Sequence, residues 1–175
     1  MDITQNFFEL FALPVQYSVD LNVLSERHLS LQKTVHPDRF AHLSDQERRV
    51  SEQYASFLNE AYTTLKSPLN RAQYLLGLAG VDVMSETSVT MEPAFLMQQM
   101  MLREELEDIP QADDPFEALD DLSSRVDGLL KGEFTKFDGL YAEQNIEQAA
   151  ASVRRLQFLV KLTRELEELE DNLED

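Results

Sequence analysis

Apolar residues recur with the spacing of an α-helix through most of the chain. Asp20 is a suitable N-cap, and the pattern after it predicts a helix that ends at His36, because Pro37 disfavours the helical conformation of the residue before it. Its expected buried face consists of Leu21, Leu24, His28, Leu31 and Val35. A second long helix is predicted to start near Ser44, where Glu47 completes a capping box, and to stop at Ser67-Pro68. Its expected buried residues are Val50, Tyr54, Phe57, Leu58, Ala61, Tyr62 and Leu65.

A short segment over residues 71–78 then ends at Gly80, and further helices follow. Pro93 suits the first turn of a helix to about Asp108, whose buried stripe is Phe95, Leu102, Leu106 and Ile109. The next helix carries Phe116, Leu119, Leu122, Val126, Leu129 and Leu130. Three glycines (Gly128, Gly132 and Gly139) weaken its continuation through Phe134, Phe137 and Tyr141. A last helix is predicted from about Glu143, so the fold is all-α and ends in an antiparallel three-helix bundle.

Charge divides the chain into two unlike parts. The 175 residues carry a net charge of −18, but residues 1–80 hold 7 basic and 9 acidic side chains, whereas residues 81–175 hold 8 and 24. Residues 81–92 are rich in β-branched and small polar side chains without helical period, which predicts a linker between an N-terminal domain (1–80) and a bundle (93–175). So negative a chain, with no run of Lys and Arg, is not expected to bind nucleic acid.

The sequence also argues against several kinds of chemistry. There is no cysteine for a disulfide, a thiolate metal site or a nucleophile. The three histidines, His28, His36 and His42, are not spaced as metal ligands, and adjacent carboxylates such as Glu104-Glu105 suit a solvated helix face. We expect no cofactor, no metal and no enzymatic activity. Without a signal-like N-terminus or an apolar run long enough for a membrane span, we expect a soluble, cytoplasmic protein.

The loop between the two long N-terminal helices reads His36-Pro37-Asp38-Arg39-Phe40. Pro and Asp are common turn residues, so the tripeptide could be a simple turn. A short loop stiffened by Pro37 could instead present the side chains of His36 and Asp38 to a partner at a low entropic cost of ordering.

The helix after Pro93 has a second apolar side. Leu96, Met97 and Met100 point away from Phe95, and Arg103 and Glu104 border them. Such a helix is either buried all round or offers a contact patch with a polar rim. Phe158 on the last helix is equally open to two readings, as a core residue or as part of a contact.

Taken together, these motifs resemble the J-domain, with which a co-chaperone stimulates the ATPase of a DnaK-type chaperone, and within that family the HscB co-chaperones of iron-sulfur cluster assembly. The similarity covers nearly the whole chain and rests on residues 6–14 (NFFELFALP), 36–40 (HPDRF), 68–76 (PLNRAQYLL), 94–100 (AFLMQQM), 102–106 (LREEL) and 153–159 (VRRLQFL). It implies a J-domain followed by a bundle that binds an IscU-type scaffold.

The resemblance also implies which residues make each contact. The expected contacts with an HscA-like chaperone are His36, Pro37, Asp38, Arg27, Lys33 and Arg39, with His28 near them on a thin basic face. The expected contacts with the scaffold are Leu96, Met97, Met100, Arg103, Glu104 and Phe158. Met101 stands where the family often has an acidic residue, which bears on the electrostatic part of that contact.

Two other functions fit parts of the sequence. Leu159, Leu162, Leu166, Leu169 and Leu173 repeat in heptads, as in a coiled-coil adaptor that dimerises through its last helix, although packing inside a bundle explains them equally well. A general J-domain co-chaperone for another client is the second alternative. The chain lacks the Gly/Phe-rich segment and the zinc-binding cysteines that would favour it.

Overall fold

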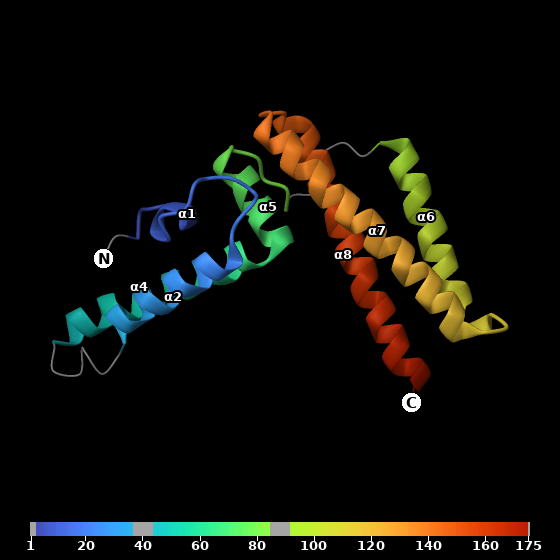
Figure 1. Cartoon of the computed structure of the whole chain (residues 1–175), viewed down its shortest axis with the longest axis horizontal. Helices are drawn as coiled ribbons and strands as arrows, with labels where there is room; N and C mark the ends of the chain where they lie inside the picture. The colour runs from blue at the N-terminus through green and yellow to red at the C-terminus, as the bar shows by residue number, and fades with distance from the viewer. Residues whose placement is uncertain (1–2, 37–43, 85–91, 175) are drawn as a thin grey trace. The chain divides into compact units, whose positions relative to one another are not determined.

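The computed structural model of this chain describes residues 3–36, 44–84 and 92–174, and every regular element within them is helical. The chain divides into two compact units, Met1–Leu75 and Leu76–Asp175. Figure 1 shows the helices of each unit. The all-α class predicted from the sequence is confirmed. Of the predicted linker, residues 85–91 lie outside the described residues.

Two antiparallel helices, α2 (Leu21–Val35) and α4 (Asp45–Lys66), form the N-terminal unit's hairpin (Figure 1). The Asp20 carboxylate accepts hydrogen bonds from the backbone N–H groups of Asn22 and Val23, at 2.9 and 3.2 Å. Ser44 and Glu47 form the predicted capping box at the start of α4. These side chains satisfy backbone donors that a helix start leaves free, so both predicted starts are confirmed.

Leu24, Leu58 and Leu65 are completely buried between the helices of this unit. Two residues of the expected stripes are not buried: Leu21 is 47% exposed and Val50 is 49% exposed. Leu21 is the first residue of α2, where little of the hairpin can cover it. The Ser51 hydroxyl donates to the carbonyl of Val35, the last residue of α2, so Val50 lies beyond the end of the helix that would have covered it.

A short helix, α1 (Phe7–Leu10), and the part of α5 (Pro68–Leu78) up to Leu75 complete the N-terminal unit. The Phe7 ring stacks on Tyr74 with the centroids 4.3 Å apart, and the Phe7 N–H donates to the Tyr74 hydroxyl at 2.9 Å. Burial raises the pKa of that phenol. α5 begins at Pro68, three residues before its predicted start, because proline is well suited to a first turn.

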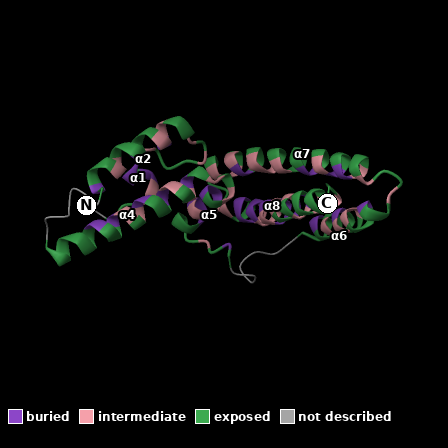
Figure 2. Ribbon diagram, turned by 90° about the horizontal axis from the view of Figure 1, so that it is seen from below, coloured by how far each residue is buried: buried purple, intermediate pink, exposed green. Residues whose placement is uncertain are grey.

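The second unit holds three long helices: α6 (Pro93–Asp108), α7 (Pro115–Ala142) and α8 (Ile146–Glu174), with the 3₁₀ turn η1 (Ile109–Gln111) after α6. Both α6 and α7 pack on α8, and their buried residues face one another (Figure 2). One hydrophobic cluster of its core consists of Phe95, Leu102, Ile109, Leu119, Leu122, Val126, Phe158, Leu159, Leu162 and Leu166.

The structure corrects three details of the predicted bundle. α7 is one helix through all three glycines, and a Cβ at any of them would meet no atom within 4 Å. α8 starts at Ile146 rather than Glu143, because Gln144 is left-handed with φ of 58°. Phe116 and Leu129, placed in the buried stripe, are 51% and 37% exposed. Phe116 is the second residue of α7, and at Leu129 the inward side has moved to Leu130.

Candidate interaction surfaces

His36 directly follows α2 and is exposed. Its φ and ψ of −58° and 133° are the extended values that a following proline imposes. Pro37, Asp38 and Arg39 of the expected chaperone contact lie outside the described residues. The described part of that expected contact is therefore His36 together with Arg27 and Lys33 on α2.

The basic residues of α2 differ in what they contact. Lys33 is exposed in the last turn. One guanidinium nitrogen of Arg27 donates to the backbone carbonyls of Phe11 and Ala12, both at 2.6 Å, so this side chain ties the end of α1 to α2. His28, which was predicted in the buried stripe of α2 and also near the basic face, is buried as that stripe requires: its ring packs against Tyr62 and adds no charge to the face. The basic face is thus even thinner than the sequence suggested.

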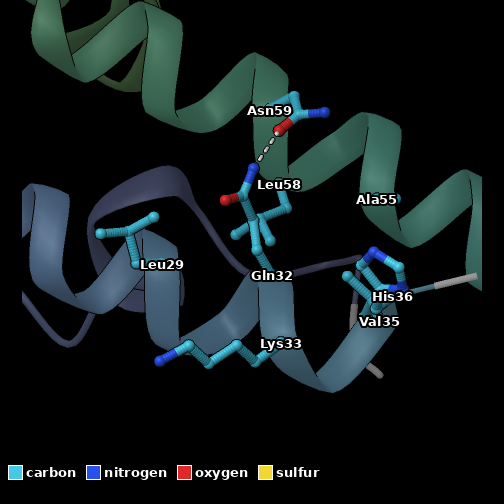
Figure 3. Close-up of a pocket in the computed structure, with 8 residues that line it drawn as sticks. All are labelled: Leu29, Gln32, Lys33, Val35, His36, Ala55, Leu58 and Asn59. Carbon is cyan, nitrogen blue, oxygen red and sulfur yellow. Dashed lines mark hydrogen bonds between the residues drawn. The ribbon is translucent and has the colours of Figure 1, made fainter. Parts of the chain in front are cut away.

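Beside His36 the hairpin has a pocket of about 330 Å³ between α2 and α4 (Figure 3). Its residues are Leu29, Gln32, Lys33, Val35, His36, Ala55, Leu58 and Asn59. The Gln32 amide donates to the Asn59 side-chain oxygen at 3.5 Å across one side, while His36 lies at one end and Leu29 at the other. The apolar walls and the nearby Lys33 suit an aliphatic side chain next to an acidic group. The sequence pattern did not predict this pocket, because its walls come from two helices that are distant in the sequence.

The second candidate surface is the outward side of α6. Phe95 and Leu102 are buried in the bundle, whereas Leu96, Met97, Met100 and Met101 are 46%, 61%, 69% and 57% exposed. We call these four residues the α6 apolar row. They are neighbours along the helix surface, because residues three and four positions apart lie on the same side. The structure thus decides the question that the sequence left open: this side of α6 is exposed and is not a wide core stripe.

Met101 is the member of this row that the sequence analysis left out of the expected contact. It follows Met97 by four residues, and this spacing could have identified it. The family resemblance instead marks Met101 as a departure from an acidic position. The row is consequently more apolar, and less charged, than the resemblance implied.

Phe158 lies in the core, with only 9% of its surface exposed. Its ring meets that of Phe95 edge to face, with the centroids 5.8 Å apart. The guanidinium of Arg103 lies over the Phe158 ring, 5.4 Å from the centroid, and pairs with the Glu165 carboxylate at 3.0 Å. Phe158 therefore supports Arg103 from below, while Glu104 is exposed next to it. Of the six expected scaffold contacts, five lie on α6, and Phe158 of α8 packs beneath one of them, Arg103.

The start of α6 is fixed to α8 by a group of charged residues. Arg155 forms ion pairs with Glu92, the N-cap of α6, and with Glu133 of α7, the latter at 3.6 Å. The guanidinium of Arg155 also lies over the Phe95 ring, 5.6 Å from its centroid. These contacts join α7 and α8 to the start of the helix that carries the α6 apolar row.

Among the residues that the structure describes, no cluster of three or more His, Cys, Asp or Glu side chains is arranged to hold a metal ion. Within the same ranges, no helix combines the length and the apolar character that crossing a membrane would require.

The heptad leucines Leu159, Leu162 and Leu166 are buried in the bundle's own core, so packing within the chain accounts for their spacing.

Residues 91–167 match the family model described as the HSCB C-terminal oligomerisation domain. The "Co-chaperone protein HscB homolog" of Aliivibrio salmonicida is 45% identical over 168 residues, which cover 96% of this chain and 98% of that protein. This chain belongs to the HscB co-chaperone family. The resemblance predicted from the sequence is thereby confirmed.

Solved HscB structures agree over nearly the full length. Chaperone HscB from Vibrio cholerae is 41% identical, with a TM-score of 0.87 over 97% of this chain and 99% of that one. The human co-chaperone protein HscB is 27% identical, with a TM-score of 0.89 over 97% of this chain and 84% of that one. As an HscB-family member, this chain is a J-type co-chaperone in iron-sulfur cluster assembly. The family implies a chaperone and, in general terms, an iron-sulfur scaffold as partners.

Proposed function

We propose that this HscB-family chain stimulates the ATPase of an HscA-like, DnaK-type chaperone and delivers an IscU-type scaffold to it. In this proposal residues 1–80 are the J-domain, residues 81–92 are the linker and residues 93–175 bind the scaffold. The protein acts in the cytoplasm. Delivery promotes maturation of the cluster and its transfer from the scaffold.

The observation that carries the proposal is the exposure of the α6 apolar row. The bundle already has a core of its own, to which Phe95 and Leu102 contribute from the opposite side of the same helix. Three methionines and a leucine left side by side in solvent do nothing for that core. A contiguous apolar patch of this kind marks a surface for a protein partner. Arg103 and Glu104 border it, and polar residues at the rim are usual for such surfaces.

On the chaperone side, the contact comprises His36, Pro37, Asp38, Lys33, Arg39 and Arg27. Pro37 stiffens the loop, so His36 and Asp38 can reach a partner at a low entropic cost. Arg27 contributes less freely, since two backbone carbonyls already hold its guanidinium. With so few cations on this side, electrostatic steering toward an acidic chaperone surface is weak and falls with salt.

The two contacts act in sequence. The bundle brings the scaffold, and the J-domain loop engages the chaperone where its nucleotide domain meets its substrate domain and linker. Hydrolysis of ATP then closes the chaperone on the delivered scaffold. Because the two contacts lie on different parts of the chain, a substitution in one should abolish that contact and leave the other intact.

Replacing His36 with Gln tests the chaperone half. Steady-state ATP hydrolysis by the HscA-like chaperone is measured with wild type and with His36→Gln, and scaffold binding by each is measured separately. The proposal predicts that the variant no longer stimulates hydrolysis and binds the scaffold as wild type does. Full stimulation by His36→Gln would contradict the proposed role of the loop.

A further inference from the structure

Every methionine that the structure describes is exposed. Met84 is 71% exposed, and Met97, Met100 and Met101 are 61%, 69% and 57% exposed. Methionine is usually a filler of irregular gaps in cores. Here the buried clusters of both units are made of other residue types, mainly Leu, Phe, Val and Ala. A chemical change at these four sulfur atoms would therefore leave the packing of the fold intact.

Three of the four sulfur atoms belong to the α6 apolar row. Met97 is three residues before Met100 and four before Met101, so the three side chains share one side of α6. Only Leu96 adds to the row a side chain without sulfur. Most of the apolar surface that this row offers is consequently thioether.

Methionine is also the only sulfur residue in the sequence, because the chain has no cysteine. In many proteins a low-pKa thiol reacts with peroxide first and takes the role of a redox sensor. In this chain exposed thioethers are the sulfur groups available to peroxide. Their position on the proposed scaffold surface gives that reaction a consequence for binding.

We propose that Met97, Met100 and Met101 are sites of reversible sulfoxidation, which weakens binding of the scaffold to the α6 apolar row. The identity of the partner rests on the proposed function above. In the forward step, hydrogen peroxide transfers one oxygen atom to the thioether sulfur: the O–O bond breaks, an S–O bond forms, and water leaves. The sulfur is oxidised by two electrons and the peroxide is reduced.

The product is poorly suited to an apolar contact. A thioether is a weak acceptor, whereas a sulfoxide is polar and carries an oxygen that needs a hydrogen-bond donor once it is buried. Neighbouring members of the row provide no such donor, since they are Leu96 and other methionine side chains. An acceptor buried without a donor weakens binding on the order of tenfold for each such group.

The sulfoxide can be reduced back to the thioether. A methionine sulfoxide reductase with a thiol reductant removes the oxygen as water, while two thiols become one disulfide. Because the two sulfoxide epimers need different reductases, full recovery requires both enzymes. The modification can thus be removed without replacing the protein.

The first test asks where oxidation occurs. The full chain is treated with hydrogen peroxide, the peroxide is removed with catalase, and peptide mapping by mass spectrometry follows the gain of one oxygen atom at each methionine. We expect rapid oxidation of Met97, Met100 and Met101, at rates comparable with that of the exposed Met84. Circular dichroism and the thermal transition should stay unchanged. Protection of the three α6 methionines relative to Met84, or loss of the fold, would overturn the proposal.

The second test measures binding of the IscU-type scaffold, which is added only after the peroxide has been removed. Oxidation should weaken binding by wild type at least about tenfold, and the two reductases should restore it. Met84→Leu should show the same loss. In Met97→Leu/Met100→Leu/Met101→Leu, compared only with its own untreated sample, peroxide should change nothing. Equal binding by oxidised and untreated wild type would overturn the proposal.

A readout without the scaffold separates this proposal from the proposed function. On a hydrophobic-interaction column under native conditions, oxidation should shorten the retention of wild type clearly more than that of the triple leucine variant, in which only methionines outside the α6 apolar row can react. If untreated wild type fails to bind the scaffold, the proposed function fails, and this column still decides whether oxidation removes the apolar character of α6. Unchanged retention of oxidised wild type would contradict the proposed modification.

Discussion

His28 lies flat against Tyr62, with ring centroids 4.0 Å apart and ring planes at 7°. A ring nitrogen of His28 is also 3.2 Å from the side-chain oxygen of Asn59 on α4. The histidine therefore links α2 to α4 inside the hairpin, whereas His36, eight residues later, is exposed. His28 thus has a structural role, whereas His36 has a proposed role in binding a partner.

This difference can be measured. We expect His28→Ala to lower the free energy of unfolding of the N-terminal unit by about 1–3 kcal/mol, because it removes a buried stack and hydrogen bond. His36→Ala should change it by less than about 0.5 kcal/mol. Urea unfolding followed by tyrosine fluorescence suits this test, since four of the five tyrosines lie in this unit. Equal effects of the two substitutions would contradict the assignment.

The glycines inside α7 should be sites where stability can be gained. Gly132 lies in the helix interior, and a Cβ there would meet no atom within 4 Å. Gly132→Ala should therefore raise the free energy of unfolding by about 0.5–1 kcal/mol, because alanine restricts the unfolded chain and favours the helix. Gly80 is the matched control: its φ of 83° strains any other residue, so Gly80→Ala should destabilise. Thermal unfolding of both variants checks the opposite signs.

The capping box of α4 predicts a dependence on pH. The hydroxyl and the N–H of Ser44 both donate to the Glu47 carboxylate, at 2.7 and 3.0 Å, and lower its pKa from the ordinary 4.5. Because the folded state favours the charged form, this contribution to stability is present above pH 4.5 and is lost as the pH falls through the lowered pKa. The difference in melting temperature between wild type and Glu47→Gln should shrink on acidification. A difference that stays constant below pH 4.5 would contradict the prediction.

Helix starts and stops could be predicted from the sequence because local interactions decide them. The Asp20 cap, the Ser44–Glu47 box and the prolines at 68, 93 and 115 act within one or two turns of their own position. The helical hairpin and the three-helix bundle followed from these boundaries together with the apolar stripes. The family resemblance, confirmed over nearly the full chain, rested on motifs of the same local kind.

Burial of individual residues was harder to predict, because it depends on how far the neighbouring helix extends. Leu21, Val50 and Phe116 fit an apolar stripe but lie near helix ends, where no neighbour covers them. The prediction that His28 lies in the buried stripe is confirmed. A stacked tyrosine and an asparagine of the returning helix accommodate its polar ring in the interior.

The candidate scaffold surface shows the same limit. Periodicity placed Leu96, Met97 and Met100 opposite the buried stripe, but it could not decide whether a third helix covered them. For the same reason the sequence could not decide whether Phe158 is buried or exposed. In the structure it lies in the core under Arg103. Removing its ring would cost about 3–5 kcal/mol of stability, so variants of Phe158 cannot separate binding from folding.

A clean test of the surface therefore uses exposed residues alone. Leu96→Ala/Met97→Ala/Met100→Ala removes most of the α6 apolar row and keeps a good helix former at each position. Phe116→Ala/Leu129→Ala is the matched control, since these side chains are also apolar and exposed, on α7 of the same bundle. Both variants should keep the circular dichroism spectrum of wild type.

The most direct measurement is a calorimetric titration of the IscU-type scaffold into wild type and these two variants. If the α6 apolar row binds the scaffold, the triple variant should bind on the order of a hundredfold more weakly, because each central contact contributes more than about 1 kcal/mol. The α7 control should bind as wild type does. Wild-type affinity in the triple variant would contradict the account.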